Sequence, residues 1–177
     1  MACELTENPP NPVRPDPNNG KLLVWNEAQN VVLEEDLRID RVADPNSPFV
    51  ERQPDGTYVV LAGTAVSSHY LQWDPSWESA GFVSAKIKLD APIFGFIIED
   101  TKLFGSDAAL GLKGHDYADF WLRGLEPGDW TSMRGDEVHI TWWAGSPGDW
   151  TRLITASALL SAVPGGPGGV ALGPIAD

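Results

Sequence analysis

The stretch GFVSAKIKL, residues 81–89, decides the fold class because its side chains alternate in character. Phe82, Ser84, Lys86 and Lys88 occupy every second position, and aliphatic residues fill the positions between them. Successive side chains of an extended chain point to opposite faces of a sheet. The alternation therefore predicts a strand with one buried face and one face in water.

The same period of two recurs in residues 137–143, whereas IFGFII at 93–98 is apolar at every position, as expected of a central strand covered on both sides. Helical character is confined to SDAALGL, residues 106–112, where Ser106 or Asp107 would cap about two turns. Many short strands with almost no helix predict an all-β fold, an antiparallel β-sandwich of the jelly-roll kind. Further strands are expected at residues 21–26, 31–33, 37–42, 57–61, 64–73 and 150–155.

The two ends of the chain differ in composition from its middle. Residues 1–20 include ENPPNPVRPDPNNG, whose five prolines predict an extended N-terminal arm. Residues 21–156 form the predicted β-sandwich domain. Residues 157–177 are rich in Pro and Gly, uncharged up to Asp177, and contain several aliphatic residues. This C-terminal tail is either slack or an arm that packs on a neighbouring subunit, which makes a second copy of the chain one candidate partner.

The charge balance excludes several classes of partner. The 177 residues carry 12 Lys plus Arg against 25 Asp plus Glu, a net charge of -13. Binding to nucleic acid or to an anionic membrane surface needs clustered basic residues, and the few present here are scattered along the sequence. No run of about 18 apolar residues occurs, so no membrane span is predicted.

Cys3 is the single cysteine of the chain, which excludes an intramolecular disulfide and a zinc site built from cysteines. Ala2-Cys3 resembles the end of a bacterial lipoprotein processing site, after which Cys3 would carry lipid. The alternative is a free thiol near the N-terminus.

Six phrases of the sequence stand out: Gly63-Thr64, SSHYLQWDP (67–75), GFVSAKIKLDAPIFGFI (81–97), GSDAALGL (105–112), RGLEPGD (123–129) and SPGDWTRLIT (146–155). Together they resemble an uncharacterised β-rich domain of exported bacterial proteins, often attached to PEP-CTERM-type sorting tails. The resemblance covers about residues 22–155; it implies export and an extracellular or cell-surface location, and it carries no established activity. The tail after residue 155 departs from the pattern, because it lacks a Pro-Glu-Pro signal followed by an apolar helix and a basic end.

Eight tryptophans are many for a chain of this length, and some of them fall at turns. Trp77 and Trp130 would be exposed there and could stack on sugar rings, or they could cap the open ends of a sandwich. His139 shares a predicted strand face with Trp143, and this face is either plain sheet surface or part of a sugar-stacking platform. The four residues are the candidate ligand-binding set.

The densest group of acidic residues lies between 107 and 129. Asp107, Asp116 and Asp119 are candidate ligands for Ca²⁺, which binds six to eight oxygen atoms. The competing expectation is structural ion pairs, because two arginines are nearly the only cations in the C-terminal half of the predicted domain. The residues of these expected pairs are Arg123, Glu126, Asp129, Asp149 and Arg152.

The common catalytic motifs G-x-S-x-G, H-E-x-x-H, the P-loop and the EF-hand are missing, and no catalytic residue is assigned. His69, among apolar neighbours, is expected to be a neutral, hydrogen-bonded core residue. The sequence favours a non-catalytic extracellular β-sandwich that acts in assembly or binding, as a structural subunit or a carbohydrate-binding module. The alternative is a secreted hydrolase that acts on polysaccharides through paired carboxylates.

Overall fold

A computed structural model describes residues 3–7, 9–14, 21–75, 80–117, 121, 123–145 and 148–157. Within these ranges the chain forms strands and a single helix, which confirms the predicted all-β fold with antiparallel sheets. The elements are β1 (Cys3–Leu5), β2 (Leu22–Asn26), β3 (Val31–Val32), β4 (Leu37–Ile39), β5 (Arg41–Val42), β6 (Val50–Arg52), β7 (Tyr58–Val60), β8 (Ala65–Trp73), β9 (Gly81–Lys88), β10 (Ile93–Ile97), α1 (Asp100–Leu110), β11 (Trp130–Arg134), β12 (Glu137–Ala144) and β13 (Asp149–Ala156).

The strands form three sheets. The large sheet has the order β1-β2-β8-β13-β10-β5, and β3 also pairs with β8. The two smaller sheets have the orders β11-β12-β9 and β4-β7-β6. All strand pairs are antiparallel except β1 with β2.

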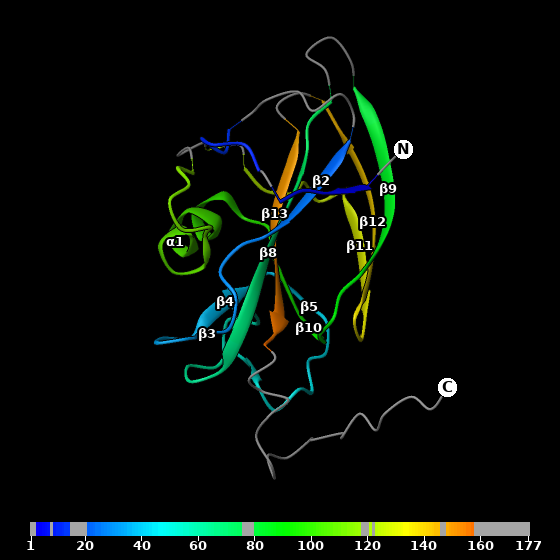
Figure 1. The fold of residues 1–177 in the computed structure, drawn as a ribbon. Helices are drawn as coiled ribbons and strands as arrows, with labels where there is room; N and C mark the ends of the chain where they lie inside the picture. The colour runs from blue at the N-terminus through cyan, green and yellow to red at the C-terminus, as the bar shows by residue number, and fades with distance from the viewer. Residues whose placement is uncertain are drawn as a thin grey trace, which may run out of the picture.

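The large sheet lies between two layers and is buried on both faces (Figure 1). One face packs against the β11-β12-β9 sheet, around a core that includes Trp73, Phe96 and Trp142. The other face packs against α1 and the β4-β7-β6 sheet, around a core that includes Trp25 and Leu103. Burial on both faces explains why the β10 sequence is apolar at every position.

Helix α1 begins at Asp100, six residues before the predicted Ser106 cap, and ends at Leu110. The helix N-cap is Glu99, whose side chain makes no capping hydrogen bond, so no capping motif marks this start in the sequence. Ser106 is buried inside the helix, where its hydroxyl donates to the carbonyl of Lys102 at 2.8 Å. The predicted cap was therefore wrong, and packing of apolar side chains on the large sheet stabilises the helix instead.

The described part of the N-terminal segment packs against the body of the protein. Strand β1 pairs in parallel with β2, and the amide of Thr6 donates to the carbonyl of Val24. Val13 is buried and forms a bridge to Tyr117. The tail from residue 158 onward lies outside the described residues. No described helix is long and apolar enough to cross a membrane.

Two glycines with positive φ give a matched test of backbone packing. Gly148 has φ 83°, and a Cβ placed on it would lie 2.2 Å from the carbonyl oxygen of Trp73. Gly63 has φ 82°, and a Cβ there would meet no atom within 4 Å. We expect Gly63→Ala to lower the free energy of unfolding by about 1 kcal/mol, the cost of the left-handed conformation.

Gly148→Ala adds a steric clash with the backbone, so we expect the free energy of unfolding to fall by about 3 kcal/mol or more, as measured by urea denaturation. Equal losses for the two variants would contradict the close approach of Gly148 to Trp73.

Candidate functional site

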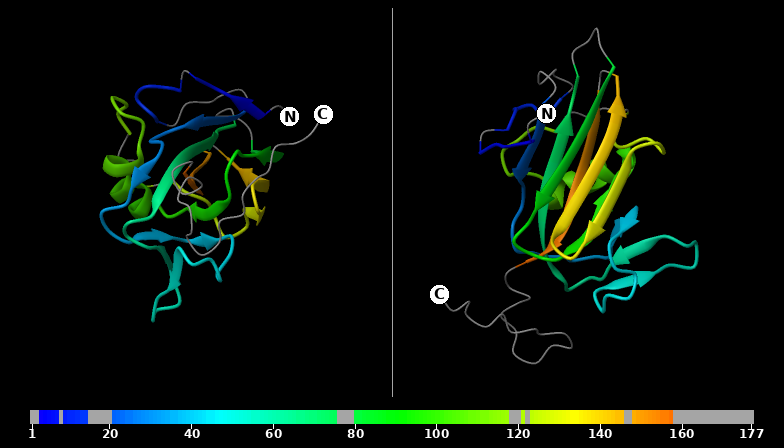
Figure 2. Two further views of the ribbon diagram at one scale, coloured as in Figure 1. Left: turned by 60° about the horizontal axis from the view of Figure 1, so that its bottom comes forward. Right: turned by 90° about the vertical axis from the view of Figure 1, so that its right-hand side faces the viewer.

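One face of the β11-β12-β9 sheet points away from the core, and we call it the outer face. The inward residues of β9 and β12 belong to the core, so the alternation of each strand places the residues between them outward. Figure 2, at right, views the molecule from the side of this sheet. The outward residues are Phe82, Ser84, Lys86 and Lys88 of β9, Glu137, His139, Thr141 and Trp143 of β12, and Trp130, Ser132 and Arg134 of β11.

Three aromatic side chains gather at one end of the outer face. Trp143 lies directly opposite Phe82, and Trp130 lies opposite Thr141, on the diagonal from Trp143. Directly opposite residues have Cβ atoms about 4.5–5.5 Å apart, and aromatic side chains reach their diagonal neighbours. The exposed fractions are 52% for Phe82, 54% for Trp130 and 61% for Trp143. We call these three residues the aromatic platform.

Exposure distinguishes the platform from four of the other tryptophans of the fold. Trp25, Trp73, Trp142 and Trp150 are fully buried, whereas Trp121, in a turn outside the sheets, is 73% exposed. Contiguous exposed aromatic rings mark an interaction site more often than single exposed apolar residues do. Its position on a regular sheet makes the platform the best candidate site in the described chain.

The residues beside the platform can form hydrogen bonds with a ligand. The hydroxyls of Ser84 and Thr141 lie 3.4 Å apart in the row of residues next to Phe82 and Trp143. His139 is exposed and lies one row further along the sheet, opposite Lys86 and Ser132.

Three of the four predicted ligand-binding residues therefore share the outer face: Trp130, His139 and Trp143. Trp77 lies outside the described residues. Phe82 was not in the predicted set, although its alternation with two lysines indicates a solvent-facing position.

A buried carboxylate fixes the backbone beneath the platform. Asp129 precedes Trp130 and is 3% exposed. Its Oδ1 accepts a hydrogen bond from the Trp143 amide at 3.0 Å, and its Oδ2 accepts one from the Glu126 amide at 2.8 Å. Asp129 thus ties the start of β11 to the end of β12.

A second buried carboxyl group lies next to the first. Asp149 is 2% exposed and hydrogen-bonds to the side chain of Asp129. Burial, together with the negative charges of Asp129 and Glu126, raises the pKa of Asp149 to about 8. Asp149 is therefore protonated at neutral pH and can donate its proton to Asp129.

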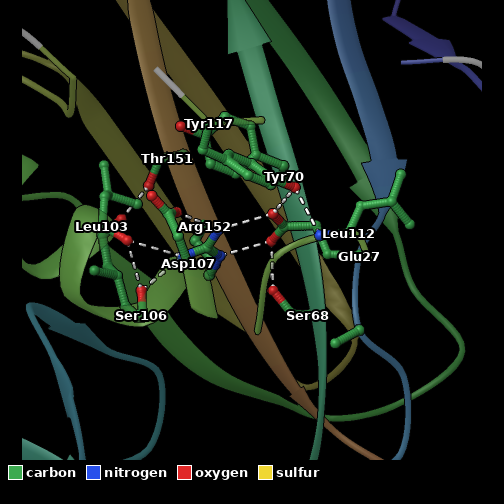
Figure 3. Close-up of polar contacts among 12 residues, drawn as sticks. Glu27, Ser68, Tyr70, Leu103, Ser106, Asp107, Leu112, Tyr117, Thr151 and Arg152 are labelled. Atoms are coloured by element: carbon green, nitrogen blue, oxygen red, sulfur yellow. Dashed lines mark hydrogen bonds and ion pairs between the residues drawn. The ribbon is translucent and has the colours of Figure 1, made fainter. Parts of the chain in front are cut away.

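The two arginines of the predicted ion pairs are buried in a charged cluster on the other side of the large sheet, and Figure 3 shows the surroundings of Arg152. Arg152 donates from Nε to Glu27 at 2.6 Å and from Nη2 to Glu27 at 2.8 Å. Arg123 forms a two-pronged contact with Asp107, at 2.7 and 2.9 Å. Arg152 also reaches Asp107 at 3.0 Å, which joins the two pairs.

The predicted partners of these arginines were wrong. Glu126 is exposed, and the buried Asp129 carboxylate accepts hydrogen bonds from two backbone amides and interacts with Asp149 rather than with an arginine. Arg152 instead pairs with Glu27 because β2 and β13 both flank β8 in the sheet. A contact between residues 125 positions apart cannot be recognised from the local sequence.

Two tyrosines complete the charged cluster. The rings of Tyr70 and Tyr117 lie beneath both guanidinium groups, with 5.4–5.8 Å between each guanidinium carbon and ring centroid. Burial raises the pKa of Tyr70 to about 12. Burial alone would lower the pKa of Arg152, but the charge of Glu27 and its hydrogen bonds raise it. The cluster is a structural connection between α1 and the sheet, because its charges are paired and buried.

The predicted calcium ligands do not come together among the described residues. Both carboxylate oxygens of Asp107 accept hydrogen bonds from arginine. Asp116 is exposed on a loop, and Asp119 lies outside the described residues. No group of three or more His, Cys, Asp or Glu in the described part of the chain has a metal-binding arrangement. Calcium binding stays a prediction.

His69 has the environment that the sequence predicted. It is 4% exposed, and its ring nitrogens lie 2.8 Å from Oδ1 of Asn26 and 3.2 Å from Oγ1 of Thr155. Burial lowers the pKa of His69, so the ring is neutral at pH 7.

A groove of about 560 Å³ lies between the 31–38 segment and α1. Its cations are occupied, since Lys102 pairs with Asp40 and Arg38 pairs with Asp55. The hydroxyl of Ser106, at the edge of this groove, accepts a hydrogen bond from Arg152. The groove is also lined by three acidic side chains, Glu34, Glu35 and Asp36, but no aromatic ring is among its lining residues, so it is a weaker candidate than the aromatic platform.

No protein-family model, no curated protein and no solved structure matches the chain significantly. The function must therefore be argued from the chain's own residues.

The buried ion pairs give a first stability prediction. Arg152→Met leaves Glu27 buried without its cation, so we expect a loss of about 3–5 kcal/mol in the free energy of unfolding. Arg38→Met removes an ion pair with Asp55 in which both side chains are about half exposed, so solvent screens the pair and its loss should cost much less stability. Urea denaturation of both variants measures the contrast, and similar losses would contradict a structural role for the buried cluster.

Asp149 gives a pH prediction. Its folded-state pKa of about 8 lies above the usual value of 3.8, so between these pH values the folded state holds a proton that the unfolded state has lost. The free energy of unfolding should therefore fall by about a few kcal/mol as the pH rises from 4 to 8.

Asp149→Asn should remove this part of the pH dependence in denaturation curves measured across the range. Asp55 serves as the comparison, because its pKa is lowered, chiefly by hydrogen bonds from Thr57. Asp55→Asn should change the profile only at its acidic end. A wild-type slope that persists in Asp149→Asn would show that Asp149 is not the titrating group.

Proposed function

We propose that this protein is a non-catalytic carbohydrate-binding module that acts outside the cell or at its surface. The observation that carries the proposal is the aromatic platform: Phe82, Trp130 and Trp143 are each more than half exposed and adjacent on one sheet. We also assign the fold to the β-sandwich class, because the large sheet and the β11-β12-β9 sheet face each other across a shared core.

The chemistry of the platform suits sugar rings. One face of a pyranose presents C–H groups, which pack on the faces of indole and phenyl rings, while its hydroxyl groups project sideways. Ser84 and Thr141 lie in the row beside Phe82 and Trp143, where they can donate to and accept from such hydroxyls.

The platform is also rigid before it binds. Trp130 and Trp143 lie on paired strands, and the Trp143 amide is held by the buried carboxylate of Asp129. A binding surface that is already ordered loses little conformational entropy on association. This rigidity favours a dedicated binding surface over rings exposed by chance on a loop.

A polysaccharide hydrolase is less well supported. The carboxyl pair closest to the platform, Asp129 and Asp149, is buried, and its members hydrogen-bond to each other. Glycosidases need two carboxyl groups about 5–9.5 Å apart that flank the substrate. Asp107 is likewise occupied by two arginines.

The test is binding of the purified chain to a glycan array, followed by titration calorimetry with the oligosaccharides that bind. Trp143→Ala and Phe82→Ala should each weaken binding about tenfold or more, because each removes a stacking surface. The matched control is Phe104→Ala, which truncates an aromatic residue of similar exposure, 53%, on α1. This control should leave the affinity unchanged.

An array on which the wild-type protein binds no glycan would contradict the proposal. Light scattering of the same variants tests self-association as the other use of the platform. If the wild type is an oligomer that Trp143→Ala dissociates, and no glycan binds, the aromatic platform is an assembly interface.

A further inference from the structure

The outer face changes in character along its length. Its cross-strand rows begin with Phe82 and Trp143, continue with Ser84, Thr141 and Trp130, and end in two rows that carry charge. The charged rows are Lys86, His139 and Ser132, followed by Lys88, Glu137 and Arg134. We call these two charged rows the basic end. Successive rows are about 6.7 Å apart, so the basic end begins within about two rows of the aromatic platform.

This basic end is unusual for so acidic a chain. It carries Lys86, Lys88 and Arg134, three of the 12 basic residues, and Glu137 is the one acid among the eleven side chains of the outer face. Exposed charges further away than about 8–10 Å are largely screened at physiological ionic strength. A ligand on the outer face therefore meets a local excess of positive charge despite the overall charge of -13.

The basic end already binds a carboxylate of its own. Lys86 contacts the carboxylate of Glu137 at 2.8 Å, and Lys88 contacts that of Asp136 at 3.7 Å. The hydrogen bond from Lys86, followed by the charges of Lys86, Lys88 and His139, lowers the pKa of Glu137. Arg134 is exposed, and no ion pair to it is found among the described residues. Its guanidinium is suited to a two-pronged contact with a carboxylate.

We propose that the ligand of the outer face is an acidic polysaccharide, with sugar rings stacked on the aromatic platform and carboxylate groups bound by Lys86, Lys88 and Arg134. The inference rests on the proposed carbohydrate-binding function and specifies its substrate class. Along β9, Phe82 and Lys88 lie about 20 Å apart, which is enough for a chain of several sugars to contact both ends.

Nucleic acid is the other polyanion that combines rings with charge. The observations favour a polysaccharide because the face and its adjoining turn carry only three permanent cations against two acids, Glu137 and Asp136, and the rest of the chain is strongly acidic. Binding to nucleic acid depends on neutralising many phosphates. A poly(dT) oligomer therefore belongs in the test as a competing ligand.

The test is calorimetric titration of the whole chain with hexamers of galacturonate and of mannuronate, and with the methyl esters of both, which keep the rings but lose the charge. We expect at least one acidic hexamer to bind more tightly than its ester, with an affinity that falls as salt is added. Lys88→Gln and Arg134→Gln should each weaken binding of the acid about two- to fivefold and leave binding of the ester unchanged.

Glu137→Gln should change the affinity for the acidic hexamer in the opposite direction. It removes the carboxylate that competes for Lys86, so the acidic hexamer should bind about two- to fivefold more tightly. Lys113→Gln, at an exposed lysine outside the sheet, is the matched control and should have no effect.

The outcomes separate the two proposals. Esters that bind as tightly as acids would overturn the acidic ligand and leave carbohydrate binding intact. Failure of every acid and ester hexamer would overturn the acidic-ligand proposal, and an array without any bound glycan would overturn both. Binding of poly(dT) in preference to the acidic hexamers would replace the polysaccharide with a nucleic acid.

Discussion

The packing of β9 and β12 on the large sheet is the constraint on which the rest of the argument depends. Val83, Ile140 and Trp142 are buried between the two sheets, and because a strand alternates with a period of two, their neighbours must face solvent. A shift of one residue in the register would bury Trp143 and expose Trp142. The hydrophobic core thus determines which aromatic residues form the platform.

Polar groups are used differently on the two faces of the large sheet. On the face that carries α1, buried arginines and acids satisfy one another, and Arg152 joins Glu27 to the helix through Asp107. Toward the β11-β12-β9 sheet, the buried carboxyl group of Asp149 lies next to Asp129, and Asp129 holds the backbone of Trp143. The first arrangement stabilises the fold, and the second supports the candidate site.

Much of the candidate site could be predicted from local sequence. The alternation in residues 81–89 and 137–143 places Phe82, His139 and Trp143 outward without knowledge of the fold. The pairing of Arg152 with Glu27 could not be predicted, because it depends on how distant strands neighbour β8. The start of α1 could not be predicted either, since the Glu99 side chain makes no capping hydrogen bond and tertiary packing determines the helix.

The central claim is that an oligosaccharide lies on the aromatic platform. Its most direct test is an NMR titration that follows the indole N–H signals of the eight tryptophans as a bound glycan is added. The account predicts shifts for Trp130 and Trp143, while the buried indoles of Trp25, Trp73, Trp142 and Trp150 stay unchanged. Binding that leaves the signals of Trp130 and Trp143 in place would contradict it.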